Sequence, residues 1–123
     1  MTAALLAGAV THVTPTDVGV RASVAVPLDD PVFAGHYPGF ALLPGVYLVD
    51  VVHQVVRAAR PAYPRLRLAA VDRCRFRSPV YPGDELEVTV ALADGDAGPT
   101  CSATVHTQRG AALDLRLSYE ELR

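Results

Sequence analysis

The feature that most constrains the fold is an apolar segment, 45–60, enclosed by Pro44 and Pro61. Its length of about fifteen residues exceeds that of a typical β-strand and favours a helix, although its many valines have low helix propensity. Pro61 would end this helix because proline has no amide hydrogen to donate. A helix that is apolar on most of its sides is normally buried. We therefore predict one long central helix inside the core.

Most of the remaining chain has the pattern of β-strands separated by turns. We expect strands at 5–13, 18–27, 66–78, 85–93, 100–109 and 111–120, and a turn-rich loop at 28–44. In the second of these segments alternate residues are apolar, from Val18 to Val26, which is typical of a strand with one buried face. One helix with five or six antiparallel strands predicts an α+β fold in which the sheet wraps around the helix. One side of such a helix is easily left uncovered, so we also expect a homodimer.

The composition sets limits on the domain and its partners. A chain of 123 residues has room for one core, so we expect a single domain, 1–123. A formal net charge of −2 gives no overall reason to expect a nucleic acid. The apolar stretch 3–10 is too short to span a membrane and lacks a basic region before it, so we interpret it as part of a strand. Together with the two cysteines, Cys74 and Cys101, this favours the cytoplasm and no membrane contact.

Asp50 is the first candidate functional residue, because it lies in the second turn of the predicted helix among leucine and valine residues. Burying an unpaired carboxylate costs several kcal/mol, about the whole stability of a small domain. The carboxyl group is therefore either paired or used. His53, Gln54 and Arg57 follow on the same side of the helix. Taken alone, this polar stripe is also typical of a solvated helix face, or of an Asp50–His53 pair facing water.

His36 is the second candidate, because its loop has an unusual setting. Glycines on either side allow the backbone to approach a ligand closely, while Pro38 restricts the loop. The predicted helix then begins at Gly45, and its unpaired amides form a site for a carbonyl oxygen that gains negative charge. A base, an acid and an oxyanion donor in one stretch are what an α,β-elimination beside a thioester carbonyl requires. We interpret the other histidines as structural or exposed: His12, His53 and His106.

Two ordered blocks carry a resemblance to a known family. The first is Gly35-His36-Tyr37-Pro38-Gly39 followed by Pro44-Gly45-Val46, Asp50 and Gln54, and the second runs from Val71 to Asp84. From about 18 to 119 the chain resembles the 3-hydroxyacyl-[acyl-carrier-protein] dehydratases of the FabZ/FabA type. It departs from that pattern at Ala41, where the family has proline, and at Tyr37, where the family has phenylalanine. The acid is aspartate, as in the FabA branch, rather than the glutamate of the FabZ branch.

The resemblance implies a hot-dog fold and a role for each matching residue. His36 would remove a proton from C2 of a 3-hydroxyacyl thioester, and the Gly45 amide would hold the thioester oxygen. Asp50 would protonate the departing 3-hydroxyl group, and Gln54 would orient Asp50. The resemblance further implies that the acyl chain is carried on the phosphopantetheine of an acyl carrier protein, with no other cofactor. It also implies that His36 and Asp50 meet across a dimer interface.

Two groups of residues are candidates for binding rather than catalysis. The residues that could line an acyl tunnel are Tyr37, Phe40, Val46 and Phe76, although such residues are often simply core. Arg73, Arg75 and Arg77 alternate along one expected strand and so share a face opposite Cys74 and Phe76. This row either docks the acidic carrier protein or is an ordinary solvated strand face.

Two other functions share the expected fold. One is a hot-dog acyl-thioesterase, which has no need of the His36 loop. The other is a non-catalytic hot-dog subunit that completes a heterodimer, against which the presence of both His36 and Asp50 argues. The sequence also leaves open whether such dimers assemble further into a trimer of dimers. No third ligand accompanies Asp50 and His53 at a useful spacing, so we expect no metal.

Overall fold

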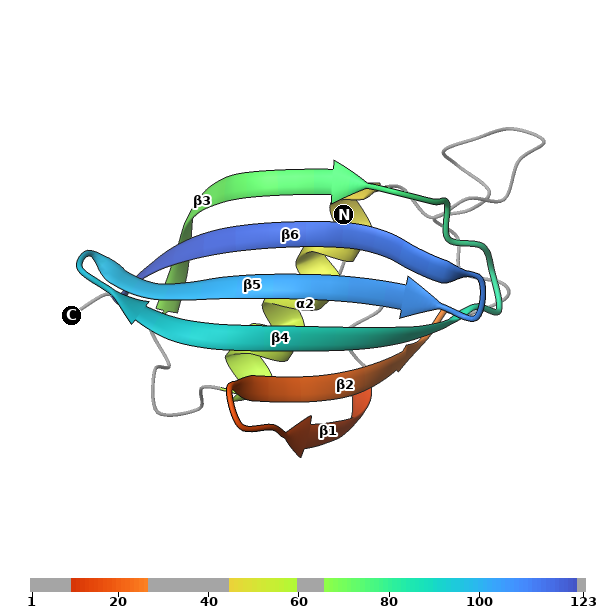
Figure 1. The fold of residues 1–123 in the computed structure, drawn as a ribbon, viewed down its shortest axis with the longest axis horizontal. Coiled ribbons are helices and arrows are strands. Elements are labelled where there is room, and N and C mark those ends of the chain that lie inside the picture. Colours follow the sequence, from red (N-terminus) through yellow and green to blue (C-terminus); the bar gives the residue numbers. More distant parts are fainter. Residues whose placement is uncertain (1–9, 27–44, 60–65, 122–123) are drawn as a thin grey trace.

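The computed structural model describes residues 10–26, 45–59 and 66–121. These residues form a six-stranded antiparallel sheet, in the order β1-β2-β4-β5-β6-β3, with a helix packed against one face (Figure 1). The elements in chain order are β1 (Val10–Pro15), β2 (Gly19–Ala25), α2 (Gly45–Ala59), β3 (Leu66–Phe76), β4 (Glu85–Gly95), β5 (Gly98–Thr107) and β6 (Gly110–Glu121). The predicted α+β fold is therefore confirmed.

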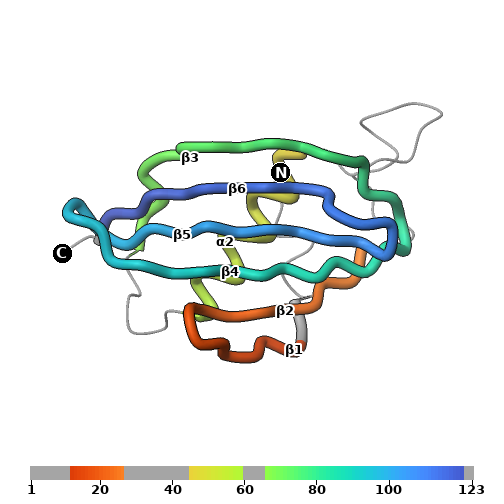
Figure 2. Tube along the Cα trace, viewed as in Figure 1, coloured from red at the N-terminus to blue at the C-terminus, as the bar shows by residue number. Residues whose placement is uncertain are grey.

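The predicted central helix is present as α2, and it crosses the sheet from behind β3 and β6 to behind β2 (Figure 2). Its fully buried residues recur at helical spacing: Leu48, Val51, Val52, Val55 and Val56. They pack against the inner faces of the strands, where Leu86, Val88, Leu113 and Leu117 are also buried. The low helix propensity of valine is overridden here because each buried valine removes apolar surface from water.

The strand predictions hold with shifts at their ends. In β2 the alternating residues Val20, Ala22 and Val24 are buried as predicted, whereas Val18 is 64% exposed because it lies in the bend before the strand. The first strand ends at Pro15 rather than near residue 13, and residues 5–9 of that prediction lie outside the described residues. An edge strand tolerates Pro15 because its missing amide hydrogen is not needed by a neighbour.

The strand β3 forms the other edge of the sheet and is unusually exposed. Apart from Leu66 and Leu68, its side chains are exposed on both faces, including Val71 and Phe76. Its pairing with β6 is interrupted by two irregularities, one on each side of Ala70. No helix in the described part of the chain has the length and apolar character needed to cross a membrane.

Candidate active site

The first turn of α2 meets the end of β3. A Cβ atom on Gly45 would lie 2.5 Å from Cζ of Phe76, so the phenyl ring packs directly against the bare backbone of the first helical residue. Phe76 is 53% exposed and the adjacent Val46 is 68% exposed. The structure thus brings together the predicted amide donor and an aromatic residue predicted to contact the acyl chain. Both apolar side chains remain accessible to a ligand or to another chain.

Asp50 and Gln54 are half-buried one turn apart on the helix. The Gln54 Nε2 donates a long hydrogen bond of 3.5 Å to Oδ2 of Asp50. This is the contact expected of residues at positions i and i+4. Asp50 lies five residues beyond Gly45, which corresponds to about 7.5 Å along the helix axis. A carbonyl group at the helix start and a hydroxyl oxygen three bonds from its carbon could therefore be reached from the same helix.

His53 does not face water as a simple pair with Asp50. Its Nδ1 lies 3.0 Å from the Tyr119 hydroxyl, and the two rings are stacked with 5.6 Å between centroids and an interplanar angle of 14°. Burial lowers the pKa of His53, and the Arg57 guanidinium lowers it further, while Asp50 opposes both effects. Burial raises the pKa of the Tyr119 hydroxyl well above its usual range. Both groups are therefore neutral at pH 7.

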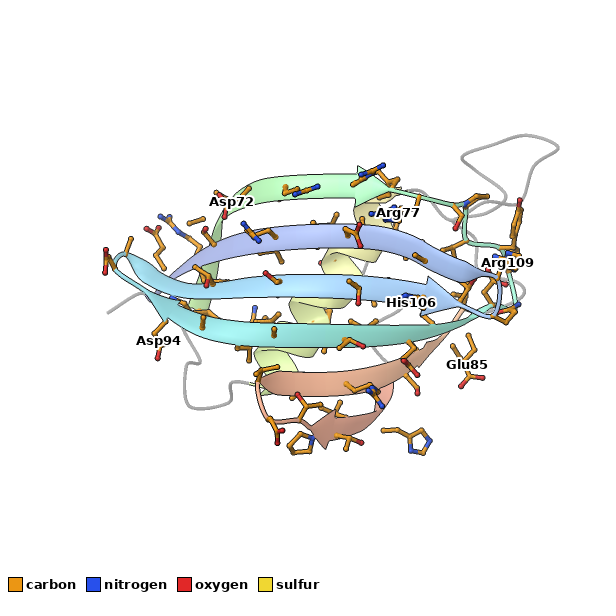
Figure 3. All side chains as sticks on the ribbon, viewed as in Figure 1. Asp72, Arg77, Glu85, Asp94, His106 and Arg109 are labelled. Atoms are coloured by element: carbon orange, nitrogen blue, oxygen red, sulfur yellow. The ribbon has the colours of Figure 1, made fainter. Side chains whose placement is uncertain are left out.

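Two members of the predicted arginine row, Arg73 and Arg75, share the outer face of β3, whereas the strand ends at Phe76, before Arg77. Arg73 lies opposite Arg116 and Arg75 opposite Asp114, whereas Cys74 and Phe76 are paired with buried residues of the inner face. Just beyond the strand, the Arg77 Nε donates to Oδ2 of Asp114 at 2.5 Å. Figure 3 shows Arg77 beside the end of β3, near the start of the helix.

A groove of about 430 Å³ opens on the same outer face of the sheet. Arg73 and Arg116 contribute the basic side chains of its lining, and Asp114, which is paired with Arg77, contributes a carboxylate. Hydroxyl groups come from Thr89, Ser102 and Thr104. Among the described residues, neither of these two arginines forms an ion pair with a carboxylate. Like charges directly opposite each other on neighbouring strands are unfavourable, so this arrangement favours an anionic ligand or simple solvation.

Sequence reasoning missed an ionic cluster around Asp84, which it considered only as the last residue of the second block. The buried Asp84 carboxylate accepts hydrogen bonds from the Tyr81 amide at 2.8 Å, from Gln108 Nε2 at 3.1 Å and from Arg109 at 2.5 and 2.9 Å. Figure 3 shows Arg109 at the end of the sheet where β5 turns into β6. The Asp84 carbonyl also accepts from the Val26 amide at 2.9 Å. The cluster therefore fixes the end of β2 directly before 27–44.

Three predicted site residues, His36, Tyr37 and Phe40, lie outside the described residues. The relation of His36 to Asp50 accordingly stays a prediction. Within 10–26, 45–59 and 66–121, no group of three or more histidine, cysteine or acidic side chains is placed to hold a metal ion.

An antiparallel sheet wrapped around one central helix is the architecture of a hot-dog protein. The chain belongs to the ApeI-like family, whose model, described as ApeI dehydratase, matches residues 12–112. This confirms the dehydratase family inferred from the two sequence blocks.

The comparisons with individual proteins agree with this assignment. The chain is 33% identical over 99 residues to the 3-hydroxyacyl-[acyl-carrier-protein] dehydratase FabZ of Polynucleobacter asymbioticus, covering 76% of this chain and 66% of that protein. It is 36% identical over 92 residues to FabZ of Pelotomaculum thermopropionicum, covering 71% and 61%. The chain therefore spans less than two thirds of the length of these curated relatives.

A solved structure, the dehydratase heterocomplex ApeI:P from Xenorhabdus doucetiae, shares the fold. The TM-score is 0.76 at 18% identity, and the match covers 89% of this chain and 95% of that one. The predicted hot-dog fold is confirmed.

Proposed function

We propose that this protein is a dehydratase that removes water from 3-hydroxyacyl thioesters and leaves trans-2-enoyl thioesters. The observation that carries the proposal is the Asp50 carboxyl group, hydrogen-bonded by Gln54 and lying on the helix that begins at Gly45. A dehydratase of this kind needs a protonatable carboxyl group near a set of free amides, because it must stabilise an enolate-like oxygen and release a hydroxyl group.

The proposed reaction has two proton transfers, one from C2 of the substrate and one to its 3-hydroxyl oxygen. His36 takes the C2 proton, and the electron pair of that C–H bond forms the new C2–C3 double bond. The bond between C3 and its hydroxyl oxygen breaks, and Asp50 donates a proton to that oxygen, which leaves as water. The Gly45 amide stabilises the thioester oxygen while negative charge develops on it. Return of the proton from His36 to Asp50 through solvent restores both groups.

The direct test is mass spectrometry of 3-hydroxyacyl carrier-protein substrates incubated with the enzyme. We expect the loss of one water molecule from the acyl chain. His36→Ala and Asp50→Asn should each lower the rate by at least about two orders of magnitude, the scale of acid–base catalysis. His106→Gln, on the exposed outer face of β5, is the matched control and should keep the wild-type rate. A near wild-type rate in either site variant would remove that residue from the mechanism.

An acyl-thioesterase is the second candidate, because a hot-dog fold with a helix carboxylate could instead activate water. The two reactions give different products from the same substrate. Hydrolysis releases a free thiol, which a thiol-reactive dye detects, whereas dehydration leaves the thioester intact and creates a conjugated double bond. Release of thiol without loss of water would replace the dehydratase proposal.

We further propose that the protein pairs with a second hot-dog chain through β3. This edge strand is eleven residues long, and its inner face exposes Val71, Cys74 and Phe76. In the part of the chain that the structure describes, no strand pairs with the outer edge of β3. Unpaired backbone groups beside exposed apolar side chains favour addition of another strand. A second copy would also bring a second His36 loop to the assembly. The structural relative is part of a heterocomplex, which supports a different hot-dog chain as the alternative partner. Native mass spectrometry of the purified chain distinguishes a homodimer from a chain that needs a different partner.

The acyl carrier protein is the proposed partner that delivers the substrate. Arg73 and Arg75 lie on the outer face of β3, and Phe76 connects the end of this strand to Gly45. A carrier protein bound at the end of β3 would extend its phosphopantetheine arm around the end of this strand to reach the first turn of α2. Arg77 is already paired with Asp114, so we assign it a smaller share of the docking.

A further inference from the structure

We propose that the groove on the outer face of the sheet binds a phosphate group, which Arg73 and Arg116 hold between their guanidinium groups. The ligand class is a phosphate monoester or diester. This site is separate from the acyl site, because α2 lies against the opposite face of the sheet (Figure 1). The sequence gave no reason to connect Arg116 with the arginine row of β3.

The register of the sheet builds this groove from two neighbouring rows of side chains. The rows cross β4, β5, β6 and, for the first of them, β3, and they are Ala91-Ser102-Arg116-Arg73 and Thr89-Thr104-Asp114. All seven residues line the groove. Neighbouring strands lie about 4.8 Å apart, so side chains of one row can reach the same small ion. The residues on β4 and β5 are small and form the floor, while the two long arginine side chains form a wall.

Arg73 and Arg116 differ from four other arginines of the sheet and its turns. Those four each pair with a carboxylate: Arg21, Arg67, Arg77 and Arg109. Within 10–26, 45–59 and 66–121, Arg73 and Arg116 have no such pair, although they lie directly opposite each other on neighbouring strands. Like charges in opposed positions repel each other and destabilise the sheet. An anion bound between them would remove this repulsion.

The carboxylates beside this arginine pair are engaged with other groups. Asp114 accepts a hydrogen bond of 2.5 Å from Arg77 Nε, and Asp72 accepts one from the Ser118 hydroxyl group. The ion pair of Asp114 with Arg77 has no net charge. The groove therefore keeps the positive charge of its two guanidinium groups, which favours an anionic ligand.

The donors of the groove fit a phosphate group better than a carboxylate. A guanidinium group donates two parallel hydrogen bonds to a pair of phosphate oxygens, and arginine is well suited to this geometry. Ser102 and Thr104 add hydroxyl groups that can donate to a further oxygen. A carboxylate has only two oxygens, which a single guanidinium group can occupy. The combination of two arginines and several hydroxyl groups therefore favours phosphate.

The test is calorimetric titration with inorganic phosphate at constant ionic strength, together with the melting temperature. We expect phosphate to raise the melting temperature, because a ligand that binds only the folded protein stabilises it. Arg73→Gln and Arg116→Gln should each weaken phosphate binding at least about tenfold, the effect of one hydrogen bond to a charged group. Without phosphate both variants should melt at or above the wild-type temperature, because the repulsion is removed. Arg21→Gln, which breaks a pair with Glu87 on the same face, is the matched control and should keep the wild-type affinity.

Simple screening of charge would give a different result. Acetate at the same ionic strength would then stabilise the wild type as much as phosphate does, and this outcome would overturn the proposal. Equal weakening of phosphate binding in Arg21→Gln and Arg116→Gln would also overturn it, because the effect would then depend on the total charge and not on the groove.

A carrier protein with and without its phosphopantetheine arm identifies the source of the phosphate. If the arm supplies it, Arg116→Gln should weaken binding of the carrier that has the arm and leave binding of the other carrier unchanged. If a free phosphorylated compound supplies it, both carriers should bind Arg116→Gln as they bind the wild type, while inorganic phosphate binds more weakly. This comparison rests on the proposed dehydratase function. The titration with inorganic phosphate does not, so an absence of dehydration would leave the phosphate site standing.

Discussion

The phenyl ring of Phe76 occupies the space into which a side chain on Gly45 would extend, with 2.5 Å between a Cβ built there and Cζ of the ring. The close approach of the ring to the helix start therefore depends on the missing side chain at position 45. The relationship joins the end of β3 to the start of α2, two elements that are separate in the sequence.

Gly45→Ala should lower activity more than it lowers stability. The added methyl group must displace Phe76, whose half-exposed ring can rotate away, while alanine is the better helix former by about 1 kcal/mol. We expect kcat to fall about tenfold, since small displacements at a reacting centre are costly, with the melting temperature unchanged or raised. Kinetics with thermal unfolding measures both. The double variant Gly45→Ala/Phe76→Leu, with a smaller side chain at 76, should recover part of the loss. Full activity in Gly45→Ala alone would contradict a role for this contact.

Charge reversal on β3 should affect delivery of the substrate and not the chemistry. Arg73→Glu combined with Arg75→Glu should raise KM for carrier-bound substrate about tenfold, because an acidic partner would be repelled. The KM for a short free thioester should not change. Arg21→Glu, on the outer face of the distant strand β2, provides the control. An equal effect on both substrates would show that the row is only a solvated strand face.

Asp84→Asn should destabilise the fold in a pH-dependent way. The Arg109 hydrogen bond lowers the pKa of Asp84 in the folded state, so its contribution is complete above the unfolded pKa of about 4 and is lost as pH falls through the folded pKa. We expect a loss of about 2 kcal/mol in the free energy of unfolding at pH 7, as for hydrogen bonds to a charged group. Urea unfolding at pH 7 and near pH 3 should show this difference shrinking in acid. Asp96→Asn, in the exposed turn after β4, should show neither effect.

The two cysteines should differ in reactivity with a maleimide. Cys101 is 1% exposed, and burial raises its pKa to about 12, so it should react only after unfolding. Cys74 is exposed on the edge strand β3 and should react in the native protein. If β3 forms the interface between chains, dilution that separates them should increase the rate at Cys74. A rate at Cys74 that does not depend on concentration would count against that interface, and Cys74→Ser should abolish native labelling.

Local sequence patterns were sufficient for the elements and for part of the site. The apolar run between Pro44 and Pro61 predicted α2, alternating residues predicted the buried face of β2, and i,i+4 spacing predicted the contact between Asp50 and Gln54. Such features depend only on the periodicity of a helix or strand, which neighbouring residues express directly.

Only the tertiary structure decided which distant residues meet. His53 and Tyr119 lie 66 positions apart, and Asp84 and Arg109 lie 25 apart. Their contacts depend on the strand order β1-β2-β4-β5-β6-β3 and on the register of each pair, which no short segment encodes. The sequence predicts that the helix begins at Gly45. The contact between Gly45 and Phe76 arises only because the end of β3 lies beside the start of α2. The sequence by itself therefore determined the candidate acid and its helix, and packing determined what surrounds them.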